Sequence, residues 1–87
     1  MELIFKPLAV EDIAYFKKTG NKVVQKKIET LLKEIKTSPY SGTGKVEQLK
    51  HGLSGYWSRR INREHRIVYK VIEKDELVEI YSLKGHY

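Results

Sequence analysis

The stretch YWSRRINREHRIVYKVIEKDELVEIYS, residues 56–82, decides the fold. Two turns of only three polar residues separate three runs that are rich in aromatic and β-branched residues; the runs span 56–61, 65–72 and 76–82. Turns this short join antiparallel neighbours in a sheet. The stretch therefore predicts a three-stranded antiparallel meander.

The preceding half of the chain predicts one strand followed by two helices. Residues 1–6 have strand character, which Pro7 ends because it cannot donate a hydrogen bond to a strand ladder. Residues 10–19 predict a short helix that Gly20 closes. Residues 21–36 predict a longer helix, capped by the asparagine at its start. Its apolar residues recur at i, i+4, i+7 and i+11 and form one stripe for the core: Val24, Ile28, Leu31 and Ile35.

Together these elements predict an α+β fold of one domain, residues 1–87. Two helices cover one face of a mainly antiparallel sheet of about four strands, to which the N-terminal strand is added. A chain of this length hides only about 60–65% of its surface on folding, so a functional site is expected in a surface cleft. The other face of the sheet stays available. Periodicity leaves open which side of 65–72 faces it, because both sides are mixed.

Charge and composition narrow the classes of function. The chain has 17 Lys and Arg against 11 Asp and Glu, and residues 42–70 alone carry seven basic and two acidic groups. Such a basic segment is typical of a protein that binds a polyanion. A charged face in contact with solvent explains the excess of basic residues equally well. The absence of cysteine excludes disulfides and thiolate metal sites. No apolar run is long enough to span a membrane and the start lacks the features of a signal peptide, so a cytoplasmic protein is expected.

The loop YSGTGKV, residues 40–46, superficially resembles a phosphate-binding loop. It lacks the spacing GxxxxGK[ST], and it follows a helix instead of preceding one. A nucleotide-binding function is therefore rejected.

If the polyanion is RNA, cutting it without a metal requires a base, an acid and cations that stabilise the charge on phosphorus. Metal and other cofactors are not expected, since the three histidines show no ligand spacing and no carboxylate cluster accompanies them. Glu47, close to Lys45 and Lys50, is either the base or half of a surface ion pair. His86 is either the proton donor or part of a solvated tail.

Four arginines lie on the predicted strands and their turn: Arg59, Arg60, Arg63 and Arg66. Side chains alternate across a strand, so Arg59 and Arg60 point to opposite faces, and so do His65 and Arg66. Only some of the four can therefore meet one phosphate.

The run KVEQLKHGLSGYWSRRINREHRIVYKV, residues 45–71, together with the terminal His86-Tyr87, resembles the YoeB (Txe/YoeB) family of bacterial toxin–antitoxin toxins, which have a RelE-like fold. The pattern LKHxLSGxWSRRIxxEHRxVY with a C-terminal HY is long and specific. The similarity continues through TSPYSGTGK, residues 37–45, and covers essentially the whole chain.

The resemblance implies a ribosome-dependent endonuclease that cleaves mRNA in the ribosomal A site without a cofactor and so arrests translation. It also implies a YefM-like antitoxin that folds over the cleft, contact with operator DNA only through the antitoxin complex, and a homodimer. A non-catalytic toxin of the same fold group, such as a gyrase inhibitor, or a plain nucleic-acid-binding module is the alternative.

Matched by position, the family's general base falls on Glu47, its general acid on His86, and the arginine that stabilises the phosphorane on Arg66. Its terminal aromatic residue falls on Tyr87. Four further positions are candidate RNA contacts: Lys50, His51, Arg59 and Arg60. The main departure is Lys84-Gly85 before His86, where the glycine is expected to loosen the tail.

Overall fold

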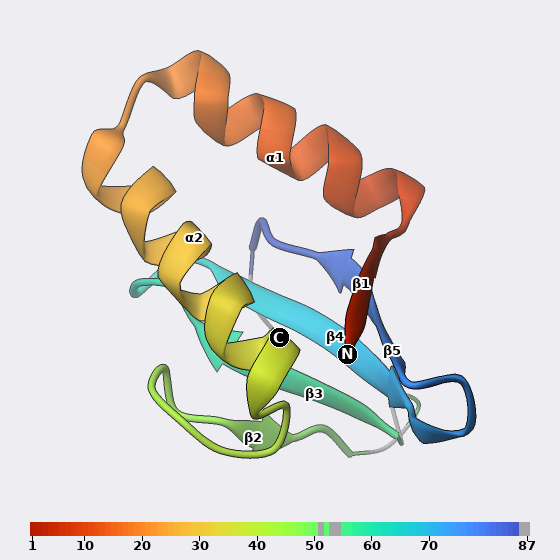
Figure 1. The fold of residues 1–87 in the computed structure, drawn as a ribbon. Helices are drawn as coiled ribbons and strands as arrows, with labels where there is room; N and C mark the ends of the chain where they lie inside the picture. Colours follow the sequence, from red (N-terminus) through yellow and green to blue (C-terminus); the bar gives the residue numbers. More distant parts are fainter. Residues whose placement is uncertain (51, 53–54, 86–87) are drawn as a thin grey trace.

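The computed structural model describes residues 1–50, 52 and 55–85. Within these residues, two helices, five strands and the short 3-10 turn η2 follow one another. Their bounds are β1 (Glu2–Phe5), α1 (Pro7–Thr19), α2 (Lys22–Thr37), β2 (Glu47–Gln48), β3 (Tyr56–Arg60), β4 (Arg66–Ile72), η2 (Glu73–Asp75) and β5 (Leu77–Ser82). The strands form one sheet in the order β1-β5-β4-β3-β2, and both helices lie against the same face of it (Figure 1). The predicted α+β architecture is confirmed.

The sheet is mixed because its two ends are built differently. The meander of β3, β4 and β5 is antiparallel, as the short turns predict. β1 adds to the far edge by pairing in parallel with β5. At the other edge, β2 pairs antiparallel with β3 through Glu47 and Gln48. The expected sheet of about four strands therefore has five, since a strand of two residues has no periodicity to detect.

Both helices begin and end for local reasons. α1 starts at Pro7, three residues earlier than predicted, because the fixed φ of proline suits the first helical position. It ends at Gly20, which adopts a left-handed φ of 72°. The side chain of Asn21 then accepts a hydrogen bond from the Val24 amide and caps α2, as predicted. Within the described residues, neither helix is long and apolar enough to cross a membrane.

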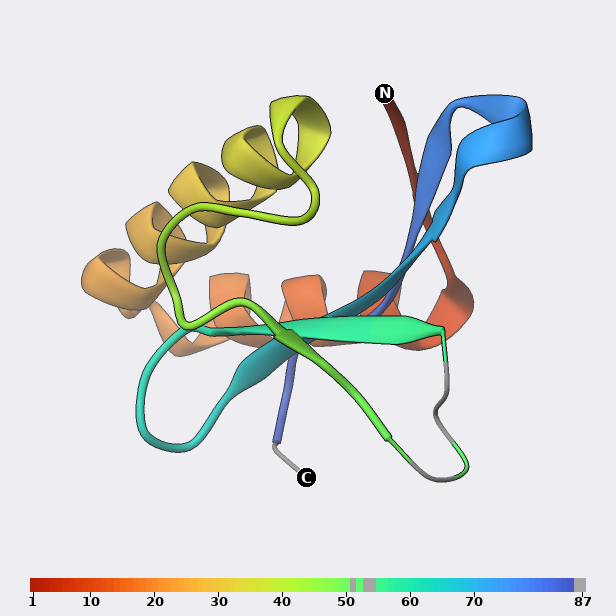
Figure 2. The same cartoon turned by 90° about the horizontal axis from the view of Figure 1, so that it is seen from below.

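The core fills the space between the helices and the sheet. The predicted stripe of α2 is buried, and it packs with α1 and with the inward residues of the sheet. The core consists of Ala9, Phe16, Val24, Ile28, Leu31, Ile35, Ile61, Ile67, Tyr69, Val78, Ile80 and Leu83. Viewed from below, α2 lies on one side of β2 and β3, and the blue C-terminal segment runs toward the other side (Figure 2). We call this second side, which carries the side chains of Glu47, Ser58 and Arg66, the open face.

Arg59 is fully buried beneath α2, which corrects its assignment as an RNA contact. Its Nη2 donates to the carbonyls of Ser38 at 2.5 Å and Ser41 at 2.7 Å. Its Nη1 donates to Glu34 Oε1 at 3.1 Å, and its Nε donates to the Tyr69 hydroxyl at 3.2 Å. A buried charge is tolerated only when it is paired and hydrogen-bonded. The strand alternation was right, and it turns Arg59 toward the helices.

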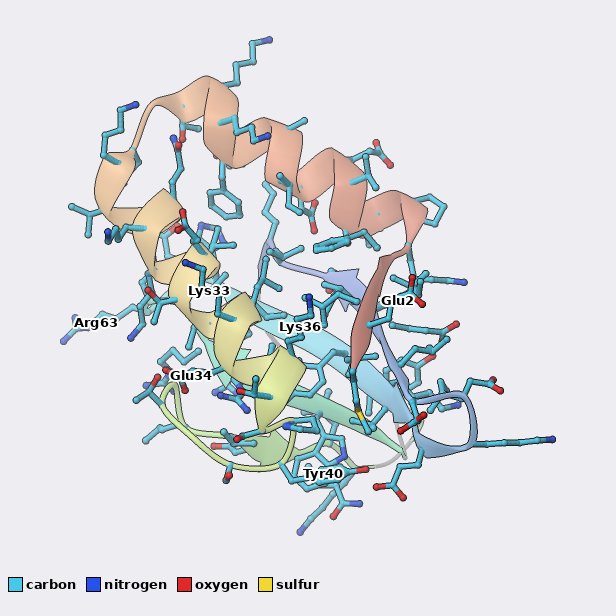
Figure 3. All side chains as sticks on the ribbon, viewed as in Figure 1. Glu2, Lys33, Glu34, Lys36, Tyr40 and Arg63 are labelled. Carbon is cyan, nitrogen blue, oxygen red and sulfur yellow. The ribbon has the colours of Figure 1, made fainter. Side chains whose placement is uncertain are left out.

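The loop between α2 and β2 is held by the same cluster. Glu34 lies on the side of α2 that faces this loop (Figure 3), and its carboxylate accepts from both the amide and the hydroxyl of Thr43, each at 2.8 Å. These two hydrogen bonds, followed by the charge of Arg59, lower the pKa of Glu34. Gly42 lies so close that a Cβ there would be 2.5 Å from Glu34 Oε1. The residues that lead into Glu47 are thus fixed from inside the protein.

We expect Arg59→Leu to lower the free energy of unfolding by about 3–5 kcal/mol, because it leaves a carboxylate and several carbonyls without their partner. Urea denaturation measures this change. Arg63→Leu is the matched control, since Arg63 projects outward from the turn between β3 and β4 (Figure 3) and its loss should change stability by less than about 0.5 kcal/mol. Equal effects of the two substitutions would contradict the role given to Arg59.

The lowered pKa of Glu34 predicts a pH dependence of stability. A carboxylate whose pKa is lower in the folded chain stabilises the fold above its ordinary value of 4.5, and this contribution is lost as the pH falls through the folded value. The parent should therefore be more stable than Glu34→Gln at pH 7, and the difference should shrink toward pH 3. Thermal unfolding of both proteins across this range measures it; a constant difference would contradict the assignment.

Candidate functional site

The open face brings Glu47 and Arg66 together through the register of three strands. Glu47 of β2 pairs with Ser58 of β3, which pairs in turn with Val68 of β4. Arg66 lies two residues before Val68 and therefore points to the same face. A carboxylate, a hydroxyl and a guanidinium from three strands consequently meet on the open face.

Within this cluster, Arg66 and Glu47 form an ion pair. Nη1 of Arg66 lies 3.4 Å from Oε2 of Glu47 and donates to the Ser58 hydroxyl at 3.3 Å. The Arg66 side chain is 17% exposed, whereas that of Glu47 is 51% exposed. Arg66 is thus held in place along most of its length, and the Glu47 carboxylate is open to solvent. Ser58, which is buried at this site, was not predicted, and only the β2 register would have identified it.

The C-terminal tail reaches the same place. The backbone amide of Arg66 donates to the carbonyl of Gly85 at 2.9 Å, so the described tail ends beside the first residue of β4. The predicted acid His86 and the predicted aromatic Tyr87 follow Gly85 in the sequence and lie outside the described residues. His51, a candidate RNA contact, lies outside them as well.

The two other candidate RNA contacts lie on β3 and in the segment that follows β2. Arg60 is paired with Arg66 across the β3–β4 ladder, where it is half-buried. Lys50 is exposed and follows β2 by two residues. Val68 shares the face of Arg66, but it is only 1% exposed. Lys70 is half-buried, and its ammonium group lies 5.4 Å from the centre of the Tyr56 ring.

This arrangement can perform acid–base chemistry on an anion. An exposed carboxylate can accept a proton, and a guanidinium presents a planar fork of donors to phosphate oxygens. Among residues 1–50, 52 and 55–85, no group of three His, Asp or Glu side chains could hold a metal ion.

Comparison with known proteins assigns the family. The model of the YoeB-like toxin of bacterial type II toxin–antitoxin systems matches residues 5–87. The chain is 44% identical over 87 residues to toxin YoeB of Escherichia coli strain K12, with 100% of both chains covered.

Solved structures agree with the sequence match. A YoeB/ParE toxin from Agrobacterium tumefaciens superposes with a TM-score of 0.93 at 36% identity and 100% coverage of both chains. The YoeB–YefM complex from Staphylococcus aureus gives a TM-score of 0.85 at 48% identity, covering 100% of this chain and 98% of the other. A YoeB dimer from the same organism matches with the same TM-score and coverage at 46% identity. Their fold is the one described above, and the chain belongs to the YoeB family of toxins from bacterial type II toxin–antitoxin systems.

Proposed function

We propose that this YoeB-family toxin is a ribosome-dependent endoribonuclease that cleaves mRNA in the ribosomal A site and so stops translation in the cytoplasm. The observation that supports this most directly is the ion pair of Glu47 and Arg66 on the open face, 3.4 Å apart and beside the tail at Gly85. A toxin that only binds its target needs cations and apolar contacts, but it does not need an exposed carboxylate beside an oriented guanidinium.

The proposed reaction assigns one step to each group. Glu47 removes the proton of the ribose 2′-hydroxyl, and the 2′-oxygen then attacks phosphorus. Arg66 stabilises the added negative charge on the phosphorane oxygens. The bond from phosphorus to the 5′-oxygen breaks, and His86 gives its proton to that oxygen. The products are a 2′,3′-cyclic phosphate and a 5′-hydroxyl, so protons and electrons balance without a redox partner.

Three residues have supporting roles in this proposal. Tyr87 supplies a ring against a base, which single-strand binders use for about 1–3 kcal/mol per base. Arg60 and Lys50 contact phosphates of the message or of ribosomal RNA. Arg60 is close enough to Arg66 in the ladder for neighbouring phosphates to meet both side chains.

We expect Glu47→Ala, Arg66→Ala and His86→Ala each to relieve growth arrest on induction and to lower cleavage by at least about 100-fold, as loss of an acid, base or charge stabiliser does. Glu29→Ala is the matched control, because Glu29 also lies in an exposed ion pair, 3.3 Å from Lys33. Loss of either carboxylate, in Glu47→Ala or in Glu29→Ala, should change the free energy of unfolding by less than about 1 kcal/mol.

Primer extension on a reporter message during induction measures the cleavage itself. Parent toxin should give ends within the A-site codon, and Glu47→Ala should not. If all three active-site variants stay as toxic as the parent, the catalytic scheme is wrong. DNA damage without mRNA cleavage would instead support a gyrase inhibitor.

We further propose that a YefM-like antitoxin covers the open face and that the toxin forms a homodimer. The Staphylococcus aureus relative has been solved both with YefM and as a dimer. The net charge of +6 favours an acidic antitoxin with a segment that orders on binding.

Electrostatic attraction should then speed the association of toxin and antitoxin. The association rate should fall by about tenfold or more between 50 mM and 500 mM salt, while the dissociation rate changes far less. Stopped-flow fluorescence measures both rates. An association rate that does not depend on salt would remove charge steering from this account.

A further inference from the structure

The C-terminal tail is held firmly, although it lies close to the end of the described chain. The amides of Leu83 and Lys84 both donate to Oδ2 of Asp12 on α1, at 2.8 and 3.1 Å. Asp12 is only 6% exposed. A buried carboxylate is costly unless hydrogen bonds satisfy it, and these two amides do so. The first part of the tail is therefore bound to α1.

Gly85 is then held from two adjacent residues at the start of β4. Its amide donates to Nδ1 of His65 at 2.9 Å, and its carbonyl accepts from the amide of Arg66 at 2.9 Å. Both backbone groups of one residue are thus occupied. Gly85 is itself an anchoring point, whereas the expectation that it loosens the tail concerns His86 and Tyr87, which lie outside the described residues.

The hydrogen bond that Nδ1 accepts defines the tautomer of the His65 ring. Nδ1 accepts a hydrogen bond from the Gly85 amide, so the ring carries its own proton on Nε2, which lies 3.8 Å from the Glu64 carboxylate. The ring also packs edge-on against Phe16, with the centroids 5.0 Å apart. Its side chain is 15% exposed. The imidazole is therefore fixed in the orientation that binds the tail.

The side chains of His65 and Arg66, the two residues that hold Gly85, face opposite sides of the sheet. His65 points toward α1, where it contacts Phe16, and Arg66 points to the open face, where it contacts Glu47. Gly85 is bound between them. A side chain on the helix side thus fixes Gly85 beside the backbone of Arg66, the residue whose side chain forms the ion pair on the open face.

We propose that His65 and Asp12 are positioning residues, which hold residues 83–85 so that His86 acts at the Glu47–Arg66 pair. This inference rests on the proposed function. Neither side chain touches the message. They act by fixing the backbone from which the proton donor extends, and a displacement of about 1 Å at a reacting group can cost about 100-fold in rate.

The test compares His65→Leu with His65→Asn. Leucine removes the acceptor, whereas the asparagine carboxamide oxygen replaces Nδ1 as an acceptor close to the backbone. Single-turnover cleavage by ribosome-bound toxin should fall at least about tenfold in His65→Leu and be largely restored in His65→Asn. The ribosome concentration at half-saturation should stay within about twofold, because binding is not the step affected.

Hydrogen exchange of the Gly85 amide gives a readout that does not depend on activity. Exchange should be faster in His65→Leu than in the parent and slow again in His65→Asn. Thr19→Ala is the matched control, because Thr19 lines the same surface pocket as His65 and its hydroxyl donates to the Phe16 carbonyl within α1. It should change neither exchange nor cleavage.

Gly85→Ala disturbs the tail without touching the core. Gly85 has a φ of 86°, which side chains rarely adopt, and among the described residues other than its chain neighbour no atom lies within 4 Å of a Cβ built there. This variant should keep the unfolding temperature of the parent and lose cleavage. It keeps the inference testable if His65→Leu does not fold.

The outcomes separate this inference from the proposed function. If the parent cuts mRNA and His65→Leu and Gly85→Ala cut equally fast, the positioning role is overturned and the nuclease stands. If the parent makes no cut, the proposed function and the catalytic purpose of the anchor both fail. Unchanged Gly85 exchange in His65→Leu overturns the anchor itself.

Discussion

The rest of the structure depends on the hydrogen bonds that the buried guanidinium of Arg59 donates. The guanidinium joins α2, the loop that follows α2, and the centre of the sheet, because its donors reach Glu34, the loop carbonyls and the Tyr69 hydroxyl. That loop ends directly before β2, whose first residue is Glu47. The exposed carboxylate of the candidate site is therefore placed by a charge that never reaches the surface.

Strand alternation gives the small sheet two separate functions. One residue of each adjacent pair stabilises the helix side and the next serves the open face, as in Arg59 with Arg60 and His65 with Arg66. Structural roles and the proposed chemical roles therefore occupy alternate positions of the same strands. A slip of one residue in register would exchange the two sets, so the buried cation also protects the register of the site.

Local patterns in the sequence were enough for most of the fold. The apolar stripe of α2, its asparagine cap and the short turns of the meander depend on neighbouring residues, and each was predicted correctly. Arg59 was misassigned because alternation separates two faces but does not say which one is covered. β2 was missed because a strand of two residues has no periodicity of its own to detect.

The candidate site was predictable only in part, for a similar reason. Glu47 stood out as one of two carboxylates in a basic region, and the family resemblance gave Arg66 a role. Asp12 and His65 did not stand out, because their partners are backbone amides far away in the sequence. One signal was present for Asp12: it lies three residues after Ala9 and four before Phe16, so a carboxylate occupies the buried stripe of α1.

The parallel pairing of β1 with β5 has a consequence for the order of events during synthesis. β1 is the first strand to leave the ribosome, and its only neighbour in the sheet, β5, is the last. The nascent chain cannot close its sheet until β5 has emerged, since a contact of such long sequence separation forms late. The tail anchor follows β5 directly, so closure of the sheet and arrival of the tail fall in the same final stage.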